Sequence, residues 1–252
     1  MIKMKYSLLF LVPFIMQGQS GYDIARSMDM RPAPKDLSNK TNMILKNSKG
    51  KTRNHVMVSR SMDNNQKQII WFLEPKDDRG VAFLKIEHDN KDDEMQMWLP
   101  AFKKVRRISA KKKGDAFMGS DLSYEDLSNR DLDENNYQRL NDEKWNNKDC
   151  FVLKTIPKNE TRSSYSEHVS WIDKATLTLL KERSYDRRGD LAKEKEFEYE
   201  KRGEYDLIKR VFVKDIHTNH TTEVLFTDIK VDSGLKDALF HERNLKRLPK
   251  DQ

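Results

Sequence analysis

The stretch Ile69-Ile70-Trp71-Phe72-Leu73 decides the fold class that this sequence predicts, because its apolar side chains follow one another without a polar interruption. This short run, closely followed by Pro75, suits a strand better than a helix. Successive side chains of a strand point to opposite faces of its sheet, so this strand is apolar on both faces. Such a sheet must stack on a second layer or curve around something apolar.

Alternating patterns typical of strands recur along most of the chain. We predict strands over residues 41–47, 53–61, 66–73, 81–88, 94–99 and 101–108, and again over 149–156, 166–173, 178–185, 191–201, 205–213 and 221–229. The turns between them are rich in Asp, Asn, Gly and Lys, which is typical of an antiparallel meander. Residues 129–143 have few apolar anchors, and we expect loop and irregular helix there.

Helical patterns are short and lie near the ends of the chain. Residues 22–30 carry Ile24, Ala25 and Met28 at helical spacing, and residues 233–248 carry enough leucines for a helical turn. This is too little helix to cover about eleven strands as a full layer. We therefore predict a mainly β (α+β) fold, an incomplete antiparallel β-barrel wrapped around short lid helices, with an apolar concave face.

Residues 1–20 have the pattern of a secretory signal peptide. Lys3 and Lys5 precede an apolar run over residues 7–16, and the small residues Gly18 and Ser20 precede the expected cut before Gly21. The apolar run is much shorter than the roughly 20 residues of a membrane-spanning helix. We expect export, followed by a single domain over residues 21–252.

The cysteine count indicates the compartment. Cys150 is the only cysteine, so no intrachain disulfide can form, and no cysteine near the cut could carry a lipid anchor. An exported protein without disulfides suits a bacterial periplasm better than a eukaryotic secretory route. We expect a periplasmic protein with Cys150 buried as a small apolar residue.

The charge balance excludes nucleic acid as the expected partner. Charged residues make up 35% of the chain and mean hydropathy is −0.90, but 48 basic residues stand against 41 acidic ones. A nucleic-acid binder concentrates positive charge far more strongly and usually adds aromatic stacking platforms. The low apolar share favours a sheet with a thin core over a thick closed barrel.

No residue pattern indicates catalysis or a metal site. His217 and His220 lie three apart in a strand-like segment, where they would point to opposite faces. The carboxylates of Asp121, Glu125 and Asp126 lack the spacing of a calcium loop. Ser123-x-x-Asp126 fits a capping box, and Gly119 permits a tight turn with positive φ. We expect no catalytic residue, no metal and no cofactor.

A basic run follows the strand at 94–99. It comprises Lys103, Lys104, Arg106, Arg107 and residues 111–113, all lysines. One interpretation is solvated surface, and the other is a docking patch for an acidic partner or for anionic lipid headgroups. The sequence leaves both open.

Large apolar side chains near this run are candidates for a cavity lining. On a strand, Met95, Met97 and Leu99 point to one side and Trp98 to the other. Methionine is flexible and suits an exchangeable apolar surface. Any one of these residues also fits ordinary core packing. As a set, we predict that a lipid-binding cavity is lined or rimmed by Trp71, Phe83, Met95, Met97, Leu99, Phe117 and Met118.

Several motifs resemble one protein family. They are Trp98-Leu99-Pro100, residues 104–108 (KVRRI), Phe117-Met118-Gly119-Ser120-Asp121, Tyr124-Glu125-Asp126, residues 21–25 (GYDIA) with Arg31-Pro32, Phe72-Leu73 with Pro75, and Phe83-Leu84. The chain resembles the outer-membrane lipoprotein-sorting proteins, relatives of the LolA and LolB lipoprotein carriers, over essentially residues 21–248. It departs from the family pattern at Leu122, where an aromatic is usual, and in its more basic run at 111–113.

The resemblance implies an incomplete antiparallel barrel, lidded by helices, that holds acyl chains in the periplasm, often alongside an RND/MMPL-type inner-membrane exporter. It also implies a gate at the cavity made by the motif residues Trp98, Pro100, Gly119, Ser120, Asp121, Tyr124, Glu125 and Asp126. We expect a monomeric, non-enzymatic carrier of lipid or lipoprotein acyl chains. The alternative is an adaptor of a transporter that docks through Lys103, Lys104, Arg106 and Arg107 and carries no lipid.

Overall fold

The structure, a computed structural model, describes residues 19–88, 91–158 and 162–249, and these form one curved antiparallel sheet. Its first half runs in the order β6-β5-β4-β3-β2-β1. The bounds are β1 Asp36–Lys46, β2 Thr52–Met62, β3 Lys67–Glu74, β4 Ala82–Ile86, β5 Glu94–Leu99 and β6 Lys104–Ile108. Each of these strands pairs with its neighbour in sequence, as expected for a meander.

The second half continues the sheet in the order β14-β13-β12-β11-β10-β9-β7, with β8 also paired to β9. The bounds are β7 Asn135–Arg139, β8 Glu143–Trp145, β9 Lys148–Pro157, β10 Tyr165–Asp173, β11 Leu179–Asp186, β12 Leu191–Arg202, β13 Tyr205–Asp215 and β14 Thr221–Val231. The halves join through β1 and β14, which pair from Leu37 opposite Val231 to Lys46 opposite Thr221. The sheet stays open because β6 and β7 do not pair.

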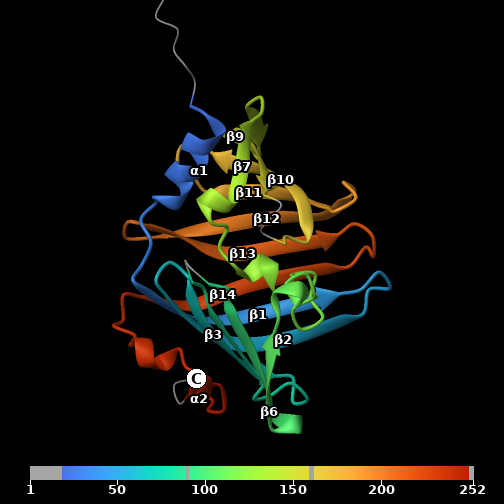
Figure 1. The fold of residues 1–252 in the computed structure, drawn as a ribbon, viewed down its shortest axis with the longest axis vertical. Helices are drawn as coiled ribbons and strands as arrows, with labels where there is room; N and C mark the ends of the chain where they lie inside the picture. The colour runs from blue at the N-terminus through green and yellow to red at the C-terminus, as the bar shows by residue number, and fades with distance from the viewer. Residues whose placement is uncertain (1–18, 89–90, 159–161, 250–252) are drawn as a thin grey trace, which may run out of the picture.

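The segment between these two open edges crosses the concave face of the sheet, and we call residues 109–134 the strap (Figure 1). It contains only short 3-10 turns, at Ala110–Lys112, Glu125–Leu127 and Leu132–Glu134. The α-helices are also short, with nine residues in α1 (Gly21–Asp29) and four in α2 (Glu242–Leu245). None of the helices in the described ranges is long and apolar enough to span a membrane.

The prediction of a mainly β, incomplete antiparallel barrel is confirmed, with fourteen strands instead of about eleven. Residues 129–143, predicted as loop and irregular helix, contain β7 and the first residue of β8. These strands are polar and lie at the sheet's edge, so they carry no apolar alternation. Residues 101–103 belong to a 3-10 turn that begins at Pro100 and ends with Lys103 in a left-handed conformation. Proline cannot donate to a ladder, so the strand starts only at Lys104.

Helix α1 is capped by Ser20, the last residue of the predicted leader. The Ser20 hydroxyl and the Asp23 carboxylate form a reciprocal capping box at the start of α1. The helix buries Ile24 and Ala25 against β9 and β10, and lies beside β7 and β9 (Figure 1). A Cβ at Gly21 would lie 2.9 Å from the backbone nitrogen of Arg139, so only glycine permits this close approach. Residues 1–18 of the predicted leader lie outside the described residues.

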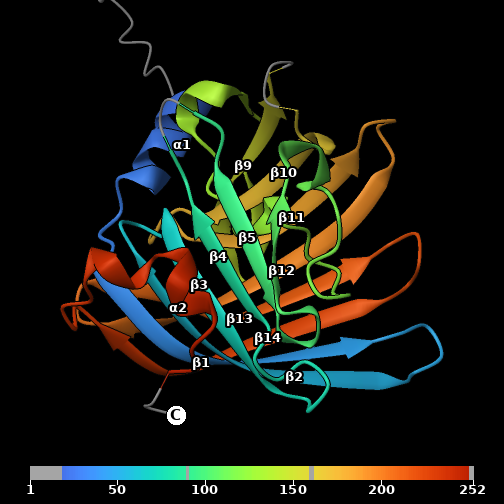
Figure 2. The same cartoon turned by 60° about the horizontal axis from the view of Figure 1, so that its bottom comes forward.

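The run at 69–73 is buried on both sides of the sheet, as predicted. Ile70 and Phe72 face the concave side, whereas Ile69 and Trp71 face the convex side. The convex side is covered by the C-terminal segment, which follows β14 and includes α2 (Figure 2). Its apolar contacts come from Leu235, Leu239, Phe240, Leu245 and Leu248.

The buried carboxylate of Asp36 ties the start of this C-terminal cover to the sheet. Asp36, at the start of β1, is 3% exposed and accepts hydrogen bonds from the backbone nitrogens of Ser233, Gly234 and Leu235 at 2.8–3.1 Å. The Ser233 hydroxyl donates a further bond at 3.1 Å. Burial opposes ionisation, but these donors keep the pKa of Asp36 below its ordinary value.

We predict that Asp36→Ala lowers the free energy of unfolding by roughly 2–4 kcal/mol, because it leaves several buried donors without an acceptor. Urea unfolding measures the change. The matched control is Asp149→Ala, since the Asp149 side chain is 68% exposed and lies 3.5 Å from Lys144 Nζ. Equal stability of the two variants would contradict this role of Asp36.

Candidate functional site

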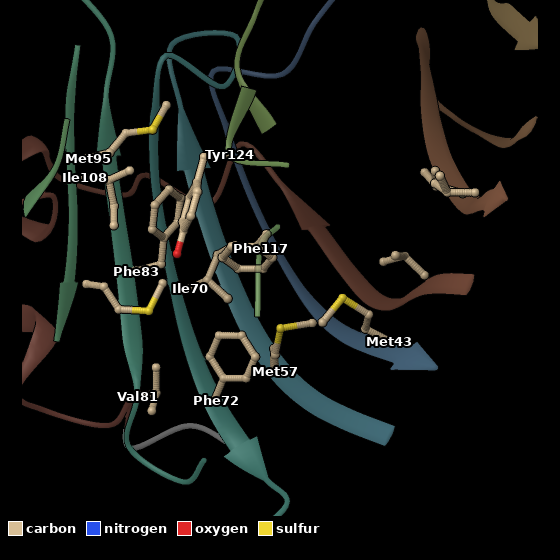
Figure 3. Close-up of a cluster of buried hydrophobic side chains, with 14 residues drawn as sticks. Met43, Met57, Ile70, Phe72, Val81, Phe83, Met95, Ile108, Phe117 and Tyr124 are labelled. Atoms are coloured by element: carbon tan, nitrogen blue, oxygen red, sulfur yellow. The ribbon is translucent and has the colours of Figure 1, made fainter. Parts of the chain in front are cut away.

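One half of the concave face is apolar, and we call its cluster the apolar half. Strands β1–β6 and β13–β14, together with Val81 just before β4, contribute the members Met43, Met57, Ile70, Phe72, Val81, Phe83, Met95, Met97, Ile108, Val211, Val213 and Val224. The cluster is completed from outside the sheet by Phe117 and Tyr124 of the strap. Figure 3 shows these two rings among the side chains of β2–β5. The strap therefore occupies the concavity.

The strap rings pack closely on the sheet. Phe117 lies 5.4 Å from Phe83 and 5.9 Å from Phe72 between ring centroids. Tyr124 lies 5.7 Å from both Phe83 and Phe117. Phe117 is 2% exposed. Such edge-to-face and tilted contacts add about 0.5–1.5 kcal/mol per pair to ordinary burial.

A tight turn presents Phe117 to the sheet. The Phe117 backbone nitrogen donates to the Leu122 carbonyl at 2.7 Å, and the Ser120 hydroxyl donates to the Phe117 carbonyl at 2.6 Å. Met118 and Gly119 have φ of 51° and 75°, so the positive φ that the sequence predicted at Gly119 is present. Asp121 anchors the turn to β14, since its backbone nitrogen donates to Thr222 Oγ1 at 2.9 Å.

The structure brings together six of the seven predicted lining residues. Phe83, Met95, Met97 and Phe117 are members of the apolar half, and Leu99 and Met118 pack against it. Trp71 is not among them, because it alternates with Ile70 and Phe72 and so lies on the convex face. There its Nε1 donates to the Asn244 carbonyl at 3.2 Å. Trp98 also lies on the convex face, beneath Lys246.

The other half of the concave face carries buried charges, and we call Asp126, Arg130, Glu182, Lys193 and Lys195 the charged network. The carboxylate of Glu182 on β11 accepts from Arg130 of the strap at 2.5 and 2.9 Å. It also accepts from Lys195 on β12 at 3.2 Å. Both side chains on the sheet are at least 96% buried. No local sequence pattern predicts this network, because its members come together only through folding.

Asp126 connects the charged network to the strap. Its carboxylate accepts from Lys193 at 2.9 Å, from Lys195, and from the Tyr165 hydroxyl at 3.0 Å. It also forms the predicted capping box, accepting from the Ser123 backbone nitrogen at 2.8 Å while Ser123 Oγ accepts from the Asp126 nitrogen at 3.2 Å. The capped element is one 3-10 turn, shorter than the predicted helix.

The ionisation of the network follows from these contacts. Burial alone would raise the pKa of Asp126, but the Lys195 and Lys193 ammonium groups hold that pKa well below its usual range. Burial also opposes the ionisation of Glu182, but the positive charges of Arg130 and Lys195 outweigh this effect and hold the pKa of Glu182 well below its usual range. Burial lowers the pKa of the neighbouring His168 to about 3, and the Arg130 guanidinium acts in the same direction. His168 is therefore neutral at pH 7.

Two cavities border this polar half. One, of about 400 Å³, lies between the strap and β10 and is lined largely by charged side chains, among them Lys113, Glu125, Asp126 and Arg130. The other, of about 280 Å³, lies beneath α1, and we call it the α1 cavity. Its lining mixes leucines of β9, β11 and the strap with Arg31, Arg130 and Glu182.

The remaining gate residues tie the strap to its surroundings. Glu125 accepts from Ser163 Oγ at 2.5 Å and from the Ser164 backbone nitrogen at 2.9 Å. Burial raises the pKa of Asp121, whose carboxylate accepts from Thr222 Oγ1 at 2.7 Å. Pro100 begins the turn before β6, away from the strap's contacts with β12 and β14.

The four predicted docking cations surround an open edge of the sheet. Lys104, Arg106 and Arg107 lie on β6, and Lys103 immediately precedes it. Register places Lys104 opposite Leu99 and Arg106 opposite Met97, on the concave side, whereas Arg107 pairs with Gln96 on the convex side. All four are exposed. They therefore flank the edge on both faces and do not form a patch on one face.

The residues considered for metal binding do not converge. Within the described ranges no group of three His, Cys, Asp or Glu side chains could hold a metal ion. His217 lies in the turn between β13 and β14, with its Nε2 3.8 Å from Asp186. Cys150 is buried and unpaired.

The neutral state of His168 predicts that acidification destabilises the protein. The unfolded chain takes up a proton near pH 6.5, whereas the folded protein does so only near 3, so the unfolded state binds more protons in between. The His168 contribution is thus lost as pH falls below 6.5, at about 1.4 kcal/mol per pH unit. Burial also lowers the pKa of His55, which adds a contribution of the same sign.

Urea unfolding of wild type, His168→Gln and the exposed control His217→Gln between pH 6.5 and 5 measures this slope. We expect His168→Gln to flatten the dependence and His217→Gln to leave it unchanged. An identical slope in all three proteins would contradict the prediction.

Comparisons with known proteins place this fold. A family model described as an uncharacterized protein matches residues 64–247. An outer membrane lipoprotein-sorting protein domain from Vibrio parahaemolyticus is 33% identical with a TM-score of 0.85, covering 90% of this chain and 98% of that one. A DUF1329 family protein from Desulfovibrio piger is 31% identical with a TM-score of 0.85, covering 89% and 97%.

A more distant solved structure is similar to this chain in its fold only. A LolA superfamily protein from Nitrosomonas europaea is 15% identical with a TM-score of 0.72, covering 90% of this chain and 99% of that one. No curated protein matches the sequence. On the identity and coverage shared with the Vibrio and Desulfovibrio proteins, this chain belongs to the family of outer-membrane lipoprotein-sorting proteins.

Proposed function

We propose that this protein is a periplasmic carrier without catalytic activity, which binds the acyl chains of a lipid or lipoprotein against the apolar half. The observation that carries the proposal is that Phe117 and Tyr124 complete this cluster from the strap, not from the sheet. When the strap moves aside, an apolar surface of the curved sheet is exposed. An acyl chain takes the place of the two rings.

The backbone contacts of the strap favour such a movement. From residue 110 to residue 128, its backbone hydrogen bonds to other backbone groups all join strap residues to each other or to Ser109. The strap is held to the sheet by side chains, such as Asp121 on Thr222 and Asp126 on Lys195. Moving the strap between residues 110 and 128 therefore breaks no backbone hydrogen bonds of the sheet. The free-energy cost of the movement is set by the side-chain contacts that hold the strap.

The free energies of burial favour displacement of the strap rings by the cargo. Burying the Phe117 and Tyr124 side chains stabilises the closed state by about 1.5–3 kcal/mol each, before the strap's polar contacts are counted. Burying an acyl chain yields about 0.8 kcal/mol per methylene, so about eight methylenes match the two rings. The chains of membrane lipids and lipoproteins are long enough to displace the strap rings and offset part of its polar anchoring.

The direct test is binding. We expect lipid to copurify with the protein from periplasm, detected by native mass spectrometry, and the purified protein to bind a fluorescent fatty acid. Absence of both signals would rule out the carrier.

A reversible lock on the strap tests the mechanism. The side chains of Asp121 and Thr222 touch, with 2.7 Å between Thr222 Oγ1 and Asp121 Oδ2. We predict that Asp121→Cys combined with Thr222→Cys, in a Cys150→Ala background, forms a disulfide that abolishes fatty-acid binding. Reduction with dithiothreitol should restore it.

The two single-cysteine variants are the controls, and they should bind equally with and without the reductant. If the oxidised double variant, with its disulfide verified by mass spectrometry, binds as well as the reduced one, the strap does not gate the site.

The adaptor function is the second candidate, and a separate observation favours it. Lys113 pairs with Asp93 at 2.6 Å, but within the described ranges no carboxylate pairs with Lys103, Lys104, Arg106, Arg107, Lys111 or Lys112. These cations surround β6, whose outer edge has no partner strand. We propose that this edge docks an acidic segment of an inner-membrane transporter of the RND/MMPL type by electrostatic attraction and strand addition.

Charge reversal separates the two candidates. We predict that Lys103→Glu, Lys104→Glu and Arg107→Glu together abolish capture of the transporter's periplasmic domain and leave fatty-acid binding unchanged. The control Lys49→Glu, Lys51→Glu and Lys144→Glu changes the net charge equally at exposed sites elsewhere. Equal capture by both triple variants would exclude docking at β6.

A further inference from the structure

Arg31 is a cation without an anionic partner at the rim of the α1 cavity. It follows α1, and its guanidinium lies over the Tyr199 ring, 5.9 Å from the centroid. Its Nε and Nη1 atoms are buried and have no hydrogen-bond acceptor, and no carboxylate of the described ranges pairs with it. The side chain lines the α1 cavity.

Buried donors of a charged group without an acceptor are costly. Leaving such a group unpaired costs about 1–3 kcal/mol or more, which is why buried guanidinium groups in proteins are usually paired. The planar guanidinium fork matches carboxylate and phosphate groups, which accept two parallel hydrogen bonds. An anion entering the cavity, with a small rotation of the fork, supplies the acceptors that the protein itself does not.

The other charges of the cavity are paired within the protein or exposed to solvent. Arg130 donates two hydrogen bonds to Glu182, and Glu182 also accepts from Ser170 at 3.2 Å and from Lys195. Asp29, the second carboxylate of the lining, is exposed on α1 and pairs with no cation of the described ranges. Arg31 is therefore the cationic side chain of the lining whose hydrogen-bond donors remain available to a ligand.

The rest of the lining indicates that the ligand is amphipathic. Met28, Leu132, Leu153 and Leu179 share the cavity with the polar groups. A volume of about 280 Å³ lies at the small end of ligand pockets, which span about 300–1,000 Å³, so it holds a headgroup but not a long chain. The chain must continue elsewhere.

The apolar half is close enough to receive that chain. Tyr199, beneath Arg31, lies two residues along β12 from Phe197, which packs against the apolar half. Two residues of a strand span roughly 7 Å. A headgroup at Arg31 therefore lies next to the surface that the strap covers.

We propose that the α1 cavity binds the anionic headgroup of the cargo, a carboxylate or a phosphate, through Arg31. The cargo is then a lipid with a negatively charged head, its chain lying in the apolar half. This assignment rests on the carrier function proposed above.

The test compares two ligands with the same chain and different heads. Binding of oleate and of oleyl alcohol is measured for wild type, Arg31→Gln and the control Arg26→Gln, whose side chain is exposed on α1. We expect Arg31→Gln to weaken oleate binding about 10- to 100-fold, the loss of hydrogen bonds to a charged group. Oleyl alcohol binding should not change, and Arg26→Gln should bind both ligands like wild type.

Three results would overturn the assignment in distinguishable ways. Equal loss for both ligands, or no loss in Arg31→Gln, removes the headgroup site and leaves the carrier intact. Failure of wild type to bind either ligand removes both proposals. Binding of inorganic phosphate alone as tightly as a phosphate-headed lipid would assign the site to free phosphate.

Stability provides a second readout that a purely structural role of Arg31 would not give. Without ligand, we expect Arg31→Gln to unfold at the same urea concentration as wild type or a higher one, because it removes an unpaired buried charge. Saturating oleate should stabilise wild type more than Arg31→Gln. Destabilisation of the ligand-free variant without any change in oleate affinity would make Arg31 a packing residue.

Discussion

The two apolar faces of the β3–β5 region are the constraint on which the rest of the structure depends. Both must be kept from water, and the chain covers them by different means. On the convex side, the C-terminal segment is fixed by backbone hydrogen bonds to the buried carboxylate of Asp36. On the concave side, the strap is held to the sheet through side chains, and from residue 110 to residue 128 its backbone-to-backbone hydrogen bonds join only strap residues to each other. The two covers on opposite faces of one sheet are thus attached in different ways, and the concave one can move between residues 110 and 128 without loss of backbone hydrogen bonds of the sheet.

Much of the fold could be predicted from local pattern. The run at 69–73 indicated a sheet that is apolar on both faces. Gly119 indicated a turn with positive φ, and the Ser123–Asp126 pair indicated a capping box, and both are present. Local pattern could not show which face of the sheet is concave. Trp71 was therefore assigned to the cavity lining, although it lies on the convex face. It also missed β7, a polar edge strand whose pairing with β9 is decided by the neighbouring chain and not by its own composition.

The charged network was beyond sequence reasoning for a different reason. Asp126 and Lys195 lie far apart in the chain, and each alone has the pattern of a solvated surface residue. Their burial is tolerable only because every carboxylate has cations and hydrogen-bond donors around it, since removing one partner leaves an uncompensated charge. Against this background of full pairing, the buried Nε and Nη1 atoms of Arg31 stand out because they have no acceptor, and this contrast motivates the headgroup site that we propose.

In the carrier that we propose, the strap also accounts for the release of cargo. A ligand that must displace a bound segment has its affinity reduced by the fraction of open protein, so a strap held by about 4 kcal/mol would weaken binding about a thousandfold. The lost affinity is useful, because the returning strap covers the apolar half as the cargo leaves. Without it, a carrier would expose a large apolar patch after each delivery, which invites aggregation. Phe117 and Tyr124 therefore serve the empty protein as much as the loaded one, and this accounts for their fit to the sheet.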